Sequence, residues 1–144
     1  MNKVYIIFDC SGSMSEFGRR AVIKNVFMAV RQRYRRIEMF KWNETVVPIE
    51  KAKDIVTQGS AVAGVLCDFL KTVNEDTGIL LVSDGCWATQ DVKDICSVTE
   101  KFNVYSCYIG QDANIATLAK VQTLGRKVFE MADFPMAIEH LLRK

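Results

Sequence analysis

The chain has 144 residues, of which 49% are hydrophobic, and a formal net charge of +2. This length and apolar content predict one domain, spanning residues 1–144, with a core of ordinary size. The near-neutral charge argues against a nucleic-acid-binding domain, which is expected to carry a strongly basic face. No apolar stretch reaches the length of a membrane helix, and Val4 to Phe8 is too short for a signal peptide. We therefore expect a soluble, cytoplasmic protein.

The cysteines support the expectation of a reducing compartment. They are odd in number, five, and they include no C-x-x-C pair, which argues against a disulfide framework and against structural zinc. Three are expected to be small buried hydrophobes, while Cys10 and Cys86 flank polar loops. His140, the only histidine, lies in the last predicted helix, so no Cys–His nucleophile is expected.

The first half of the chain predicts a strand, a long helix and a hairpin. Lys3 to Phe8 is a near-continuous apolar run, as in a strand that is covered on both faces. Phe17 to Tyr34 has apolar residues at helical spacing. Ile37 to Trp42 and Val46 to Ile49 are predicted strands joined by a tight turn, and a proline in the second strand indicates the edge of a sheet.

The second half of the chain predicts helices that alternate with strands. Helices are expected at Ala61 to Val73, Asp91 to Phe102, Ile115 to Leu124 and Pro135 to Leu142. Strands are expected at Gly78 to Val82, Val104 to Ile109 and Lys127 to Met131. Such alternation indicates a three-layer, doubly wound α/β fold of Rossmann-like type, with a mostly parallel sheet and one antiparallel edge strand.

Polar loops follow the predicted strands at the points where ligands bind in such sheets. Right-handed crossovers bring the carboxyl ends of parallel strands to one edge of the sheet. The loops on that edge are Asp9-Cys10-Ser11-Gly12-Ser13, Gly59-Ser60 and Ser83-Asp84-Gly85. Their carboxylates and hydroxyls are the hard oxygen donors that Mg²⁺ and Mn²⁺ prefer. The sequence therefore predicts one divalent metal site.

The combination of D-x-S-G-S after one strand and S-D-G after a later one resembles the von Willebrand factor A domain with its metal-ion-dependent adhesion site. The strand order is similar along the whole chain, including the early edge hairpin. Tyr108-Ile109-Gly110 also resembles the end of a late strand in that family. Each motif alone has an ordinary explanation, because Asp and Ser often cap helices and S-D-G often forms turns.

The resemblance implies a set of metal ligands drawn from three loops. They are Asp9, Ser11, Ser13, Ser60 and Asp84. The two serines of the first loop would bind the metal directly, the first aspartate directly or through water, and the second aspartate through water. The second-loop ligand is open between Ser60, where the family usually has threonine, and Thr57.

The resemblance also implies a binding function rather than an enzymatic one. Neutral hydroxyls would leave the metal much of its positive charge, so that an Asp or Glu carboxylate of a protein partner could complete its coordination. Candidate partner-binding residues at the rim are Trp87, Cys86, Phe17 and Arg19. For Trp87, a place in the core has equal weight. An adaptor or scaffold module is implied, and stand-alone relatives often work beside AAA-type ATPases.

The alternative from a different class is a Mg²⁺-dependent phosphohydrolase of the haloacid dehalogenase type. Such enzymes also begin with an apolar strand, which ends in D-x-D. In this chain Asp9 is followed by Ser11 at the position of the second acid. A serine cannot serve as the acid/base that this chemistry requires, so the binding module is favoured. A third hypothesis is a purely structural domain whose metal site has been lost.

Overall fold

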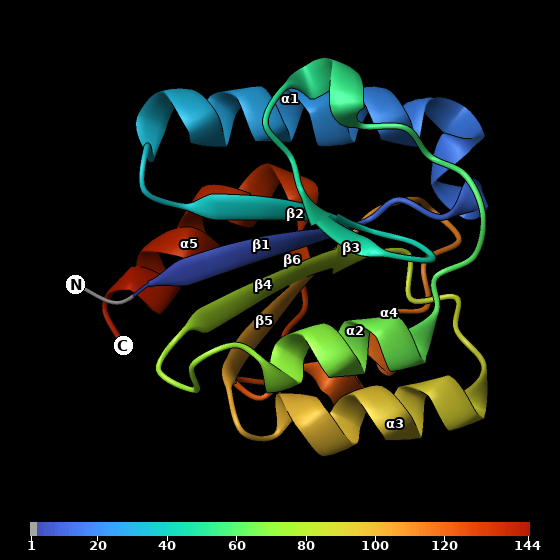
Figure 1. The fold of residues 1–144 in the computed structure, drawn as a ribbon, viewed down its shortest axis with the longest axis vertical. Coiled ribbons are helices and arrows are strands. Elements are labelled where there is room, and N and C mark those ends of the chain that lie inside the picture. The colour runs from blue at the N-terminus through green and yellow to red at the C-terminus, as the bar shows by residue number, and fades with distance from the viewer. Residues whose placement is uncertain (1–2) are drawn as a thin grey trace.

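A computed structural model describes residues 3–144, apart from the side chain of Phe17. Its sheet has six strands in the order β3-β2-β1-β4-β5-β6 (Figure 1). The strands are β1 (Val4–Asp9), β2 (Glu38–Trp42), β3 (Val46–Pro48), β4 (Gly78–Ser83), β5 (Asn103–Tyr108) and β6 (Phe129–Glu130). Only β2 and β3 pair antiparallel among these strands, and β3 lies at the edge. The predicted mostly parallel sheet with one antiparallel edge strand is confirmed.

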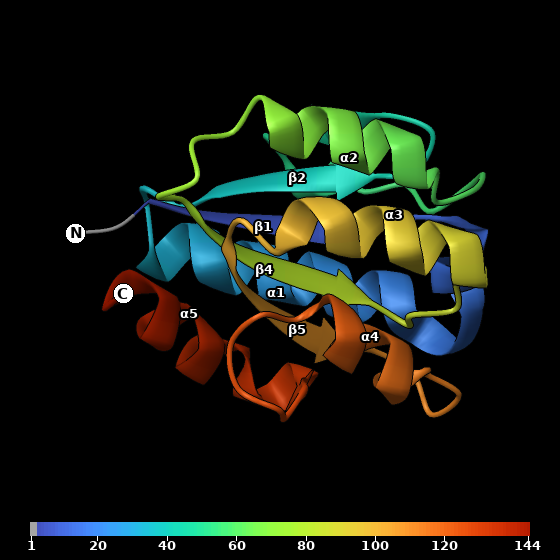
Figure 2. The ribbon, with the colours of Figure 1, turned by 90° about the horizontal axis from the view of Figure 1, so that it is seen from below.

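Helices cover both faces of this sheet (Figures 1 and 2). They are α1 (Arg19–Arg33), α2 (Ala63–Lys71), α3 (Thr89–Thr99), α4 (Ile115–Val121) and α5 (Phe134–Leu142). Helices α1 and α5 pack in one core layer, and α2, α3 and α4 pack in the other, which confirms the doubly wound, three-layer fold. Within residues 3–144, none of them is long and apolar enough to span a bilayer.

The side chains of β1 explain why its sequence is apolar throughout. Ile6 and Phe8 belong to the core layer under α1 and α5, whereas Ile7 belongs to the layer under α2 and α3. All three are fully buried. A strand in the middle of a sheet that is covered on both faces has no solvent-facing side, so apolar and polar residues do not alternate along it. The apolar run therefore positions Asp9 at the end of the central strand.

The start of α1 differs from the prediction. The helix begins at Arg19 rather than at Phe17, because residues Gly12–Gly18 form a 3-10 helix, η1, that ends at Gly18. Gly18 has a φ of 75°, a left-handed conformation that an α-helix cannot include and that glycine adopts at little cost. The apolar spacing of the segment continues across this break, so hydrophobic periodicity alone does not reveal it.

The last turn of the predicted fourth helix is also absent. Helix α4 ends at Val121 instead of Leu124. The side chain of Gln122, which is buried, donates hydrogen bonds to the carbonyls of Leu124 and Lys127 and accepts one from the backbone of Ser106. These bonds hold the chain in a turn against β5 in place of another helical turn.

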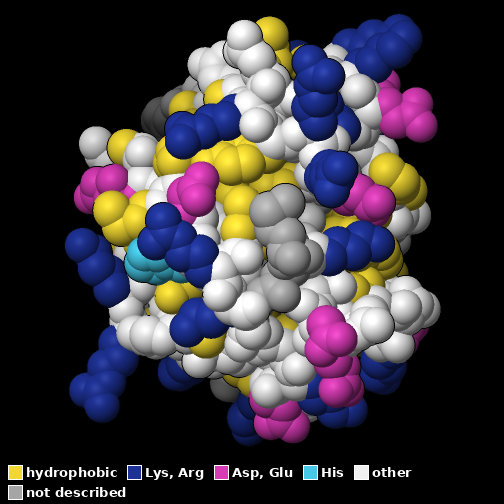
Figure 3. Space-filling view, turned by 90° about the vertical axis from the view of Figure 1, so that its left-hand side faces the viewer, with side chains coloured by type: hydrophobic (Ala, Val, Ile, Leu, Met, Phe, Trp, Pro, Cys, Tyr) yellow, Lys and Arg dark blue, Asp and Glu magenta, His cyan; other side chains and the backbone are white. Residues whose placement is uncertain are grey.

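The amino ends of the parallel strands lie at the opposite edge from the polar loops. Figure 3 views the molecule from the left side of Figure 1, where this edge and both chain ends lie. Lys and Arg side chains are spread over this face, with Asp and Glu side chains between them. The arginine-bearing last turn of α1 ends on this side, away from Asp9.

The central strand β4 offers a test of the fold. Leu80 is 1% exposed, and we expect Leu80→Ala to lower the free energy of unfolding by about 2–5 kcal/mol, because the truncation leaves a cavity. The control is Met28→Ala on the outer side of α1, where the side chain is 57% exposed and the expected change is below about 0.5 kcal/mol. Urea unfolding followed by circular dichroism measures both. Equal effects would contradict the buried position of β4.

Candidate metal centre

Asp9, the last residue of β1, organises the first polar loop. Its carboxylate is buried, and its Oδ1 atom accepts hydrogen bonds from the backbone N–H of Ser11 at 2.9 Å and from the Ser11 hydroxyl at 2.6 Å. The Oγ atoms of Ser11 and Ser13 lie 3.4 Å apart. Three of the side-chain oxygens predicted as ligands therefore converge on one point.

The second oxygen of Asp9 ties β1 to its neighbour β4. Oδ2 accepts a hydrogen bond from the hydroxyl of Ser83 at 2.6 Å, and the indole N–H of Trp87 points to it at 3.4 Å. Ser83 Oγ in turn accepts the N–H of Gly85 at 3.0 Å. The role of Ser83 is missing from the sequence-based prediction. Its signal is its position as the last residue of the strand adjacent to β1, next to Asp9.

The pKa of Asp9 reflects these surroundings. Burial raises the pKa above its ordinary value of 3.8, and the nearby negative charge of Asp84 acts in the same direction. The hydrogen bonds donated by Ser11 and Ser83 lower the pKa, because they stabilise the ionised form. The carboxylate is thus held in place by donors but is poorly solvated. A divalent cation would compensate for the solvation that burial removes.

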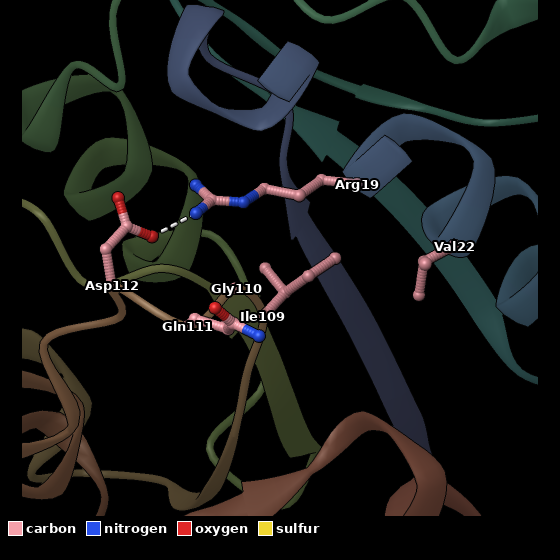
Figure 4. A pocket seen from close by; sticks show the side chains of 6 residues that line it. All are labelled: Arg19, Val22, Ile109, Gly110, Gln111 and Asp112. Atoms are coloured by element: carbon pink, nitrogen blue, oxygen red, sulfur yellow. Dashed lines mark hydrogen bonds and ion pairs between the residues drawn. The ribbon is translucent and has the colours of Figure 1, made fainter. Parts of the chain in front are cut away.

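Arg19 lies inside the site rather than at its rim. Its side chain is 4% exposed, and Nη1 donates to Asp84 Oδ2 and to the Ser13 carbonyl, both at 3.2 Å. Nη2 pairs with Asp112, an exposed carboxylate after β5 (Figure 4). Arg19 therefore joins the loop after β4 to the loop after β5.

Gly110 makes room for this guanidinium group. A Cβ atom added at Gly110 would lie within 2.3–2.6 Å of the Arg19 guanidinium atoms, closer than van der Waals contact allows. Gly110 also has a φ of 96°, which glycine adopts readily. The Nε atom of Arg19 is buried without a hydrogen-bond partner among the described residues.

The second loop lies beside the first, but within residues 3–144 none of its hydroxyls hydrogen-bonds to Asp9, Ser11 or Ser13. The backbone N–H of Gly12 donates to the carbonyl of Gly59 at 2.8 Å and fixes the two loops together. The Thr57 hydroxyl is engaged with the hydroxyl of Ser15 at 2.6 Å, and Ser60 is exposed. Both residues remain candidates for the second-loop ligand.

The predicted rim residues take different positions. Trp87 is half-buried and packs against the core residue Trp42, with ring centroids 5.6 Å apart, while its indole also faces Asp9. Cys86 is exposed, and its backbone N–H donates to Asp84 Oδ1 at 3.0 Å. Partial burial and the neighbouring carboxylates raise the pKa of the Cys86 thiol, so it remains protonated near neutral pH. The side chain of Phe17 lies outside the described part of the chain.

The donor set suits a hydroxyl-rich site rather than a site built from acids and cysteines. In residues 3–144, no group of three or more His, Cys, Asp or Glu side chains is placed to hold a metal ion. The predicted ligands are of another kind, because they combine carboxylates with serine hydroxyls. Asp9, Ser11 and Ser13 meet this requirement, and Arg19 links Asp84 to Ser13. The residues present therefore fit a hard cation such as Mg²⁺ or Mn²⁺.

Comparison with known proteins shows the fold. No family model and no curated protein matches the chain. The conserved hypothetical protein BatB from Bacteroides thetaiotaomicron has a similar crystal structure, with a TM-score of 0.69, 12% identity and complete coverage of both chains. An aerotolerance-related membrane protein from Bacteroides fragilis, crystallised with multiple mutations to serine, gives a TM-score of 0.67 and 11% identity, again with complete coverage of both chains.

A protein from a very different source shares the same architecture. Proximal thread matrix protein 1 from the mussel byssus gives a TM-score of 0.67 and 12% identity, over 99% of this chain and 47% of that one. At these identities the likeness concerns the fold alone. The six-stranded sheet with helices on both faces has a Rossmann-like α/β layout, consistent with a von Willebrand factor A domain.

The raised pKa of Asp9 predicts how pH affects the metal-free protein. The folded state holds this proton more tightly than the unfolded state, so stability falls as the pH rises through the folded-state pKa. Asp9→Asn removes the ionisable group, and with it this loss of stability at higher pH. We expect the Tm of Asp9→Asn, relative to that of the unsubstituted protein, to increase between about pH 4 and pH 8. Thermal unfolding in metal-free buffer measures it, and a constant difference would contradict a destabilising buried carboxylate.

The ion-pair cluster, which consists of Arg19, Asp84 and Asp112, gives a second prediction. Arg19→Met leaves the buried carboxylate of Asp84 without its cation, so the metal-free Tm should fall. The stabilisation on adding Mg²⁺ should at the same time exceed that of the unsubstituted protein, because no positive charge then competes for Asp84. Arg36→Met, at an exposed position between α1 and β2, is the control and should leave both quantities unchanged. A smaller gain with Mg²⁺ would show that Arg19 supports the metal instead of competing with it.

Proposed function

We propose that this chain is a metal-dependent protein-binding module that recognises an acidic residue of its partner. The observation that carries the proposal is the convergence of the Asp9, Ser11 and Ser13 side-chain oxygens at the carboxyl end of β1. In the proposal, these residues hold Mg²⁺ or Mn²⁺ together with Asp84 and with either Ser60 or Thr57. The module would act as an adaptor or scaffold, for which an AAA-type ATPase is a candidate neighbour.

The residues of the site have distinct tasks in this proposal. Asp9 orients Ser11 through two hydrogen bonds, so that its hydroxyl lone pairs are free for a cation. The backbone bond from Gly12 to Gly59 holds the second loop within reach. When bound, the metal ion would supply an electrophilic position that exchanges a water for a carboxylate oxygen.

The charge balance favours recruitment of an outside carboxylate. Arg19 already pairs with Asp84 and Asp112, so its guanidinium group offsets part of the negative charge around the site. Serine hydroxyls contribute no charge at all. A divalent ion held in this way would retain a positive field, which an Asp or Glu side chain of a partner would neutralise. Long-range attraction of acidic surfaces would follow from the same field.

Binding is favoured over catalysis by what surrounds the site. His140 packs near Tyr105 and Phe129 in the layer of α5, where it has no contact with the Asp9 loop among the described residues. The raised pKa of Cys86 disfavours a thiolate nucleophile. A hydroxyl, Ser11, stands two residues after Asp9, where the phosphohydrolase alternative requires a second carboxylate.

Metal-dependent stabilisation tests the proposal directly. Mg²⁺ or Mn²⁺ at about 100 times its Kd should raise the Tm by roughly 5–10 °C, since the ion binds only the folded state. The double variant Ser11→Ala/Ser13→Ala and the variant Asp84→Asn should lose this shift. Ser97→Ala, at an exposed position on α3, is the matched control and should keep it.

Two further variants decide between the candidate second-loop ligands. The shift should shrink in either Ser60→Ala or Thr57→Ala, and the affected variant identifies the ligand. Differential scanning fluorimetry and calorimetric titration measure these effects. Absence of any shift with millimolar-range metal in the unsubstituted protein, or an undiminished shift in Ser11→Ala/Ser13→Ala, would refute the proposal.

A further inference from the structure

A hollow lies directly beside the candidate metal centre, between α1 and the carboxyl ends of β5 and β6. It consists of two adjoining cavities of about 450 and 520 Å³. Both cavities share the walls formed by Val22, Ile109, Gly110 and Gln111, which Figure 4 labels together with the rest of the first cavity. We call the combined hollow the α1 groove. The first cavity is closed by Arg19 and Asp112, so it borders the ion-pair cluster.

The α1 groove is mainly apolar along its middle, where Gln111 is the polar member of the shared wall. Ile109 forms a buried floor, while Val22 on α1 and Ile115 at the start of α4 are 37% and 44% exposed. Met131, which follows β6, adds a flexible apolar wall to the second cavity. Large aliphatic side chains that share an open hollow would lose contact with water when an apolar guest covers them, which favours binding of such a guest.

The far end of the α1 groove is acidic. Glu130 lines the second cavity and is exposed, and its Oε1 atom accepts a hydrogen bond from the Tyr108 hydroxyl at 2.9 Å. Tyr108 is neutral, and Glu130 makes no ion pair within residues 3–144. The negative charge of Glu130 is therefore available to a cation of a guest, in contrast to that of Asp112, which pairs with Arg19.

These features occur in a fixed spatial order. The candidate metal centre comes first, the Arg19–Asp112 pair second, the apolar middle third and Glu130 last. A guest that follows this order needs a carboxylate, then an apolar side chain, then a cation. A peptide segment offers that sequence of groups along one strand of chain.

We propose that the partner binds through a short segment in which an Asp or Glu is followed in space by a bulky apolar residue and then by a Lys or Arg. This inference rests on the proposed function, because the acid would bind the metal. The apolar residue would fill the α1 groove over Ile109, between Val22 and Ile115, and the basic residue would pair with Glu130. The groove then supplies the selectivity that a metal–carboxylate bond alone lacks.

Selection from a random peptide library tests this inference. Phage displaying random peptides around a fixed Glu are bound to the full chain in Mg²⁺ and eluted with EDTA. We expect EDTA-eluted clones to share a bulky apolar residue at one spacing from the acid, with Lys or Arg beyond it. Replacing that apolar residue by Gly in a synthetic peptide should weaken binding about tenfold or more, measured by fluorescence anisotropy.

Variants of the α1 groove provide the matched controls. Val22→Asp and Ile115→Asp change exposed side chains and should abolish the apolar preference while the acid stays necessary. Glu130→Gln should abolish only the basic preference. Met28→Asp, on the same helix as Val22 but 57% exposed and outside the lining of both cavities, should change neither.

The possible outcomes separate the two proposals. Clones that elute with EDTA and require the acid but show no apolar preference would overturn the inference and leave the metal-dependent function standing. Absence of EDTA-eluted clones would overturn both. A dimer that forms only with Mg²⁺ and disappears in Val22→Asp would assign the α1 groove to a second copy of this chain, and would overturn the peptide guest.

Discussion

The site depends on the hydrogen bonds that the buried carboxylate of Asp9 accepts. One oxygen binds the backbone and the hydroxyl of Ser11, and the other binds the hydroxyl of Ser83. The first set of bonds shapes the loop after β1, and the second fastens that loop to β4. Because the carboxylate has lost most of its water, its hydrogen bonds are strong and the cost of removing any donor is high. The central strand β1 therefore fixes the position of the Asp9 carboxylate and of the loop that follows it.

Much of this arrangement could be predicted from the sequence, and the reason is topological. Apolar runs that alternate with amphipathic segments specify a doubly wound sheet, and such a sheet brings strand ends together regardless of their distance in the chain. The local spacing of Asp9, Ser11 and Ser13 predicts that their side-chain oxygens lie close together, as they do in the structure. The parallel pairing of β4 with β1 brings the loop that contains Ser83 and Asp84 to the same edge of the sheet.

The rest of the site depends on contacts that no local pattern encodes. Arg19 stands in a helix with ordinary amphipathic spacing, and nothing in that spacing indicates that its guanidinium turns inward to Asp84 and Asp112. The break at Gly18 decides where α1 begins and so where Arg19 points. Gly110 then gives the guanidinium its space. The burial of this arginine is the combined result of three segments that are far apart in the sequence.

Arg19 is shared between two structures, since it closes one end of the α1 groove and also holds Asp84. A single planar cation therefore stands between the two places where a guest and an ion would sit. Coupling between two such neighbouring binding sites is reciprocal by thermodynamic necessity. If a bound ion changed the affinity for a guest by shifting Arg19, a bound guest would change the affinity for the ion by the same factor. Cooperation between ion and guest would thus require no movement of a helix, only the adjustment of one side chain.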